Sequence, residues 1–138
     1  MMDVRLIRRA VLIWLTASGA LVGMWATLFP RSFYDDFPGF GRMWVAVDGP
    51  YNEHLVRDIG QLNLALCVVT VVAVVTMQRI VVLAAGGAWF ANGVPHLIYH
   101  ARHLDNYDTV DQIGNIISLG LLAALPLLVL TGVRNQNW

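Results

Sequence analysis

The sequence predicts an all-α integral membrane protein in which four transmembrane helices form an antiparallel bundle. Two observations lead to this fold class. First, 57% of the 138 residues are hydrophobic and only 13% are charged, whereas a soluble domain carries about 25% charged residues. Second, the chain contains four apolar stretches of about 20 residues, the length that crosses ~30 Å of hydrocarbon. Each stretch must be helical because lipid offers no hydrogen-bond partner to a peptide group.

The chain is expected to form a single transmembrane domain, residues 1–138, with predicted helices at residues 10–29, 55–77, 80–99 and 113–133. The first helix follows arginines as a signal peptide does, but its apolar run is too long for a cleaved signal and indicates a retained anchor. Only Gln78 and Arg79 separate the second helix from the third, which predicts a tight antiparallel hairpin. The connection 30–53 is rich in aromatic residues, and we expect it to lie on the bilayer surface or to cap the bundle.

The distribution of arginine predicts which side of the membrane each end faces. The nine basic residues are all arginine and balance nine acidic residues. Three arginines cluster before the first helix, which usually dominates orientation, so both termini are placed in the cytoplasm. The opposite, outer side then carries eight of the nine acids. The cytoplasmic arginines are Arg5, Arg8, Arg9, Arg79 and Arg134.

Three of the four histidines lie near the end of the third predicted helix, at His96, His100 and His103. Their spacing of i, i+4 and i+7 places them in one stripe of a helix that turns about 100° per residue. Asn92 joins this stripe one turn earlier. The sequence therefore predicts a polar stripe at the outer end of an otherwise apolar helix.

A second polar stripe, formed by His54, Asp58 and Gln61, begins the second helix. In an antiparallel hairpin that turns at residues 78–79, these three residues lie at the depths of the three stripe histidines. On the fourth helix, Gln112 and Asn115 reach the same levels. Polar groups are costly in lipid and turn inward. We therefore expect a polar pocket in the outer half of the bundle.

The residue types in this pocket suit a metal ion or a haem. Imidazoles at i and i+4 can chelate one ion, and a carboxylate from a neighbouring helix completes a set suited to zinc or iron. Alternatively, one histidine from each of two helices could ligate a haem from opposite sides. A structural role competes with both, since interfacial histidine, tyrosine and asparagine commonly hydrogen-bond to carbonyls, headgroups or water. The candidate metal ligands are His54, Asp58, His96, His100 and His103, and the surrounding pocket comprises Glu53, Gln61, Asn92, Tyr99, Gln112 and Asn115.

The layout and one stretch of sequence resemble a known group of proteins. The chain combines four short-looped helices, a proline-containing aromatic loop after the first, and a polar start to the second helix, Arg57 to Leu66 (RDIGQLNLAL). In these features it resembles the DoxX-like group of small bacterial membrane proteins. The resemblance implies a membrane location and a partnership with redox systems. The absence of lysine and the abundance of Val, Ala and Arg are typical of a high-GC bacterium, so the bacterial inner membrane is the expected location.

Three functions from different classes remain open. The first is a metal- or haem-dependent protein that performs redox or hydrolytic chemistry in the membrane. The second is a non-catalytic accessory subunit of a larger membrane complex, such as a respiratory one, whose partners are other membrane-protein subunits. The third is a protein that binds a lipid-like ligand, with Asp58 and the imidazoles at the polar end of an apolar site. No motif indicates nucleic-acid binding, and no residue is assigned a catalytic role.

Overall fold

The computed structural model describes residues 4–131 and contains four long helices, as the sequence predicts. All four are long and apolar enough to cross a membrane. Each of them begins before its predicted first residue, by one to six residues. The helices are α1 (Val4–Leu28), α3 (Glu53–Thr76), α4 (Arg79–Ala101) and α5 (Thr109–Leu130).

Polar caps explain the early starts of α3 and α5. The Asn52 side chain accepts a hydrogen bond from the backbone N–H of Leu55 at 3.2 Å, and Asp108 accepts one from Asp111 N–H at 2.9 Å. Asn and Asp satisfy free N–H groups in this way at the first turn of a helix. The helices therefore include polar residues that a hydropathy boundary leaves in the loops.

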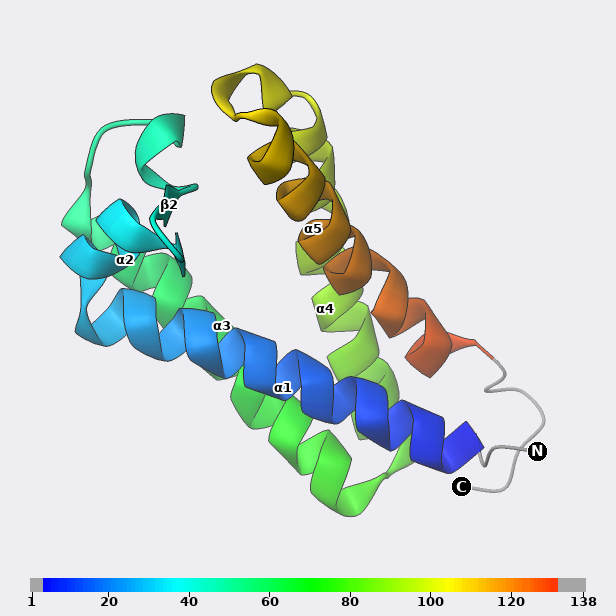
Figure 1. Ribbon diagram of the computed structural model, residues 1–138. Coiled ribbons are helices and arrows are strands. Elements are labelled where there is room, and N and C mark those ends of the chain that lie inside the picture. The colour runs from blue at the N-terminus through cyan, green and yellow to red at the C-terminus, as the bar shows by residue number, and fades with distance from the viewer. Residues whose placement is uncertain (1–3, 132–138) are drawn as a thin grey trace.

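The four helices form two antiparallel pairs, which we call arm 1 (α1 and α3) and arm 2 (α4 and α5). Within each arm the helices approach closely at glycine, as small residues allow in membrane proteins. A Cβ atom at Gly23 would lie 2.9 Å from the Leu64 side chain, and one at Gly93 would lie 2.9 Å from the carbonyl oxygen of Leu122. Figure 1 shows the two arms diverging as a V from the end where Val4 and Thr131 lie, which we call the terminal end.

The arms meet in an apolar core built around Trp89, which is 1% exposed. Its indole Nε1 donates a hydrogen bond to Thr70 Oγ1 at 2.8 Å, and its ring occupies the space that a Cβ at Gly19 would fill. Trp89 therefore joins α4 to both helices of arm 1. The rest of this core comprises Val11, Leu12, Leu15, Ala73, Met77, Val82, Ala85 and Val129.

Two arginines of α1 close the terminal end. The buried Arg8 donates from Nη2 to the carbonyl oxygen of Thr131 at 2.8 Å, and Arg9 donates from Nε to Val74 O at 3.2 Å. The acceptors belong to the last turns of α5 and α3, where carbonyl groups lack helical partners and the helix dipole is negative. Arg8 and Arg9 thus hold the start of α1 against the ends of α3 and α5.

The predicted loop 30–53 has a structure of its own at the opposite end, which we call the loop end. It contains a short helix, α2, and a two-residue hairpin in which β1 pairs antiparallel with β2. Phe33 of α2 packs against Ala26 and Val56, which fixes this segment to arm 1. The elements are α2 (Pro30–Asp36), β1 (Pro38–Gly39), β2 (Arg42–Met43) and the 3-10 turn η1 (Ala46–Asp48).

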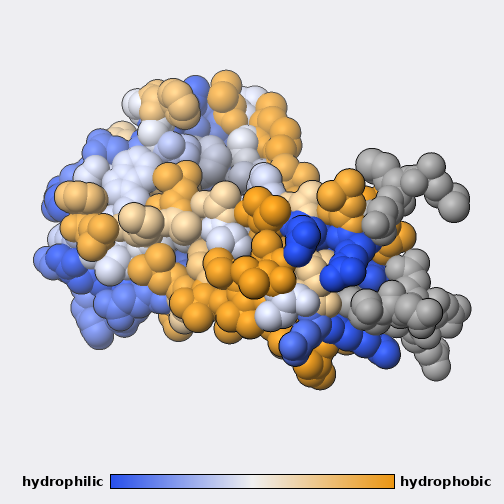
Figure 2. All heavy atoms as spheres, turned by 90° about the horizontal axis from the view of Figure 1, so that it is seen from below, coloured by the Kyte–Doolittle hydropathy of each residue, from blue (hydrophilic) through white to orange (hydrophobic). Residues whose placement is uncertain are grey.

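On the face drawn in Figure 2, apolar residues lie between hydrophilic residues toward the two ends. Large apolar side chains such as Leu21 and Leu62 are exposed, as expected for helices that face lipid. Arg5, Arg9 and Arg79 lie toward the terminal end, while Asp3 and Arg134 fall outside the described residues.

Candidate functional site

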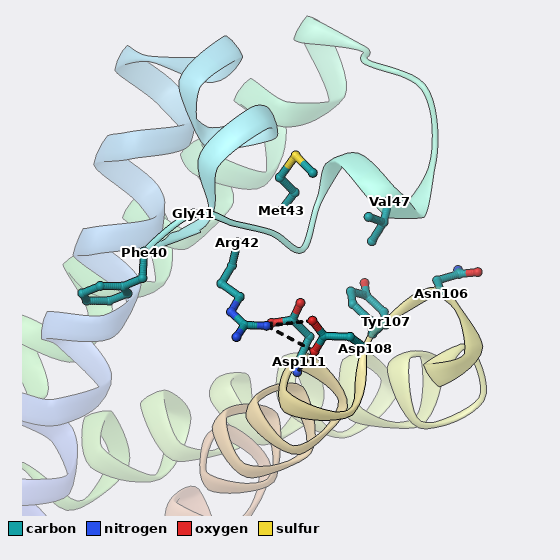
Figure 3. Close-up of a pocket in the computed structure, with 9 residues that line it drawn as sticks. All are labelled: Phe40, Gly41, Arg42, Met43, Val47, Asn106, Tyr107, Asp108 and Asp111. Carbon is teal, nitrogen blue, oxygen red and sulfur yellow. Dashed lines mark hydrogen bonds and ion pairs between the residues drawn. The ribbon is translucent and has the colours of Figure 1, made fainter.

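Residues 42–48, which we call the strap, extend from arm 1 and contact arm 2 at the loop end. Arg42 Nη1 lies 3.0 Å from a carboxylate oxygen of Asp108 and 3.0 Å from one of Asp111. Trp44 Nε1 donates to Asp111 Oδ1 at 2.7 Å, and the Trp44 ring lies against Gly114. Figure 3 shows Arg42 reaching toward the two carboxylates from the hairpin. The strap therefore bridges the open end of the V.

Tyr107 is the buried centre of this bridge. Its hydroxyl donates to the Trp44 carbonyl oxygen at 2.9 Å and lies 3.4 Å from Nδ1 of His100. Burial, together with the nearby Asp48 and the phenol of Tyr99, raises the pKa of Tyr107 to about 12. The hydroxyl therefore keeps its proton at neutral pH and remains a donor.

The charges of the bridge are also fixed at neutral pH. The backbone N–H of Asp111, and then Arg42, lower the pKa of Asp108 below its ordinary value of 3.8. The hydrogen bond to Asp111 raises the pKa of Arg42. The charged Arg42 guanidinium thus lies beside the ionised carboxylate of Asp108.

Acid should remove the contribution of Asp108 to stability. A carboxyl group whose pKa is lower in the folded state than in the unfolded state stabilises the folded protein at pH values above the unfolded-state pKa. This stabilisation is lost as the pH falls through the folded-state pKa. We expect Asp108→Asn to unfold at a lower temperature than the wild type at pH 7, and the difference to vanish well below about pH 4. Circular dichroism of detergent-solubilised protein measures both midpoints. A difference that persists unchanged in acid would contradict this assignment.

The polar side chains near the end of α4 lie on the same side of the helix as Trp89. His96 and His100 follow Trp89 by 7 and 11 positions, which is within about 20° of whole turns. At Trp89 this face is buried against arm 1, whereas at Asn92 and His96 it is exposed because the arms have diverged. We call Asn92, His96 and His100 the inter-arm face. The rings of His96 and His100 have centroids 4.9 Å apart.

The stripe of His54, Asp58 and Gln61 does not meet the inter-arm face. Thr70 marks the side of α3 that contacts Trp89, and Gln61 lies nine residues earlier, which is half a turn away. His54 Nε2 pairs with Asp58 at 3.4 Å, and the His54 side chain is 88% exposed. The prediction that this stripe faces the histidine stripe of α4 is therefore wrong. The short hairpin sets the depth of these residues, but the packing of Thr70 and Trp89 sets their rotation.

The structure consequently does not assemble the predicted ligand set. Among residues 4–131, no three His, Cys, Asp or Glu side chains are grouped so that they could hold one metal ion. His96 and His100 stay together, and both interact electrostatically with Asp48 of the strap. His103 turns aside, because its ring stacks on Tyr99 at 4.3 Å and its Nδ1 lies 2.7 Å from the Tyr99 carbonyl oxygen.

Several residues predicted to surround the pocket have local partners instead. Glu53 pairs with Arg57 at 2.9 Å within α3. Gln112 donates to the carbonyl oxygens of Leu104 and Tyr107 and thereby closes the turn between α4 and α5. Asn115 is buried and donates to Asp111 O at 3.0 Å. Of the surrounding set, Asn92 lies on the inter-arm face and Tyr99 lies beside it, with its hydroxyl 3.5 Å from Asp48.

Sequence reasoning missed the strap and its partners. Their contacts join positions more than 50 residues apart, and no spacing rule connects Arg42 with Asp108 or Trp44 with Asp111. The available signal was the hairpin sequence Gly39-Phe40-Gly41, in which both glycines have positive φ angles. An open depression of about 410 Å³ lies where the hairpin and the strap meet arm 2. It is lined by Phe40, Gly41, Arg42, Met43, Val47, Asn106, Tyr107, Asp108 and Asp111.

No family model, curated protein or solved structure matches this chain. The likeness to DoxX-like proteins therefore stays a prediction from the sequence. Function must be argued from the geometry of the arms, the strap and the inter-arm face.

Proposed function

We propose that this chain is a membrane protein that binds an amphiphilic, lipid-like molecule between its two arms at the loop end. One observation carries the proposal. The face of α4 that is buried against arm 1 at Trp89 becomes exposed and polar at Asn92 and His96. A molecule with a polar group for the imidazoles and an apolar part for the diverging helices fits such a surface.

Energetics favour an occupant of this kind. Uncompensated polar groups at membrane depth are costly, and intramembrane ionisable residues face a partner or a cavity. Asn92 and His96 lie within a helix whose apolar composition suits a membrane crossing. On α3, Asn63 precedes Thr70 by seven residues and therefore shares its face; the Asn63 amide donates to Ile59 O at 2.9 Å, and its side-chain oxygen adds a polar group from arm 1. Hydrogen bonds from a ligand headgroup would satisfy these side chains.

We also propose that the terminal end faces the cytoplasm and that the loop end faces outward. Arg5, Arg8, Arg9 and Arg79 lie toward the terminal end, and arginine near helix ends favours the cytoplasmic side. The ligand would then sit in the outer leaflet of the bacterial inner membrane, beneath the strap. Protease protection of tagged termini in membrane vesicles tests this orientation.

The ligand itself is tested by what the purified protein retains. We expect lipid extraction and mass spectrometry of protein in a mild detergent to find a bound amphiphile, and His96→Ala to weaken its retention roughly three- to tenfold through the loss of one hydrogen bond. His54→Ala is the matched control, because His54 lies on the opposite side of arm 1 and is exposed. Equal retention by both variants would overturn the proposal.

A divalent metal ion is the second candidate, because His96 and His100 are an i, i+4 pair with adjacent rings near Asp48. The two imidazoles could supply two ligands for zinc or iron, and water or a bound molecule would have to supply the others, because no third His, Cys, Asp or Glu side chain of residues 4–131 is grouped with them. Elemental analysis of the same preparations distinguishes the candidates. Metal that is stoichiometric in the wild type and absent from His96→Ala would favour the ion, and retained amphiphile without metal would favour the lipid.

A further inference from the structure

We propose that the strap is a releasable latch that sets how far the two arms open at the loop end. This inference rests on the proposed function in one respect only, that the opening leads to the ligand site. It concerns the distance between the arms, which can be measured in protein without ligand. The carrying observation is the difference between the two attachments of the strap.

On arm 1 the strap is rooted in an apolar cluster. Val45 packs with Phe37, Trp25 and Tyr51 against the buried Ala26, Phe33 and Val56. The Phe37 and Trp44 rings also meet edge to face at 6.1 Å. These contacts exclude water and involve three helices, α1, α2 and α3. The strap is therefore a fixed part of arm 1.

On arm 2 the strap is held by polar contacts, of which the ion pairs lie near the surface, whereas the hydrogen bond from the buried Tyr107 hydroxyl to Trp44 O is covered. Arg42 and Asp108 have side chains that are 32% and 64% exposed, and only Asp111, at 15%, is well covered. Ion pairs with this exposure contribute little and are weakened by salt. Asp111 has the central role because it accepts from both Arg42 and Trp44. The attachment to arm 2 is the one that can open.

Within residues 4–131, every hydrogen bond and ion pair that joins the arms at the loop end involves the strap. Beyond those already described, Tyr99 OH donates to Asp48 and Tyr107 OH donates to Trp44 O. Nearer the terminal end, the Trp89 core and Arg8 hold the arms together. Glycine contacts stiffen each arm internally. Release of the latch should therefore rotate two rigid arms about the Trp89 core.

Distances between spin labels test the latch directly. One pair of labelled cysteines, at Leu55 and Ile113, reports the loop end, and a second pair, at Val75 and Leu128, reports the terminal end; all four side chains are exposed. Cys67→Ala removes the buried native thiol. In Arg42→Met with Trp44→Phe, we expect the loop-end distance to lengthen and broaden while the terminal-end distance stays unchanged. These substitutions remove the charge, the N–H donor and part of the Trp44 ring that lies against Gly114, while both positions stay apolar.

Arg31→Met is the matched control, because Arg31 pairs with Asp35 inside α2 and does not bridge the arms. We expect it to leave both distances unchanged. If the double variant fails to fold, Arg42→Met alone removes both ion pairs of the strap, and we expect a smaller lengthening of the loop-end distance. An unchanged loop-end distance in the double variant, or in Arg42→Met where the double variant does not fold, would overturn the latch. The amphiphile could still bind in that case, so the two proposals fail separately.

Discussion

Replacing Trp89 by alanine is expected to lower the free energy of unfolding by about 3 kcal/mol, the lower end of the range for removing a buried tryptophan. The lower end applies to the membrane location proposed above, because helices in lipid gain from close packing and not from the exclusion of water. Trp89 is 1% exposed, fills the space beside Gly19 and donates to Thr70. Its loss leaves a cavity where α1, α3 and α4 meet.

Reversible unfolding of the purified protein in mixed micelles measures this loss. Trp14→Ala is the control, because Trp14 belongs to α1 but is 39% exposed and lies outside the Trp89 core. Its expected effect is within about 0.5 kcal/mol. Similar effects from both substitutions would show that Trp89 is not the residue that joins the arms.

Replacing Gly93 by alanine is expected to destabilise the protein by about 1–3 kcal/mol, the cost of overpacking a tight contact. The added Cβ would lie 2.9 Å from Leu122 O and 3.1 Å from the Ala123 backbone. These neighbours are main-chain atoms of α5, so no side chain can rotate away. The helices of arm 2 would have to separate.

Two other glycines provide controls at which alanine is not expected to lower the free energy of unfolding. A Cβ at Gly87 or Gly120 would meet nothing within 4 Å, and both residues lie inside helices. Alanine there should be neutral or stabilise by up to about 1 kcal/mol, because alanine favours a helix over glycine. The same unfolding measurement compares all three variants, and a destabilised Gly87→Ala would contradict the packing argument.

The four long helices could be predicted because their cause is local. Apolar length and the need to satisfy peptide groups act on each segment separately, so residues 10–29 and their counterparts identify α1, α3, α4 and α5. The ends were less accurate. Asn52 and Asp108 extend α3 and α5 through caps that hydropathy does not register.

The candidate site was predicted in part. The spacing of His96 and His100 placed their side chains on one face, and their rings are adjacent. The prediction that His54, Asp58 and Gln61 of α3 face these histidines was wrong because it did not account for the rotation of α3 about its axis. Residue spacing within a helix says nothing about which side meets a neighbour, and the contact of Thr70 with Trp89 turns Gln61 half a turn away.

The sequence by itself determined the four long apolar helices and the placing of His96 and His100 on one face of α4, because each depends on residues close together in the chain. The tertiary structure alone decided that the helices pair as two diverging arms and that Arg42 and Trp44 meet Asp111. Those features depend on close packing at Gly23, Gly60 and Gly93 and on contacts between distant segments. Local periodicity sets which residues share a face, but only packing sets what that face meets.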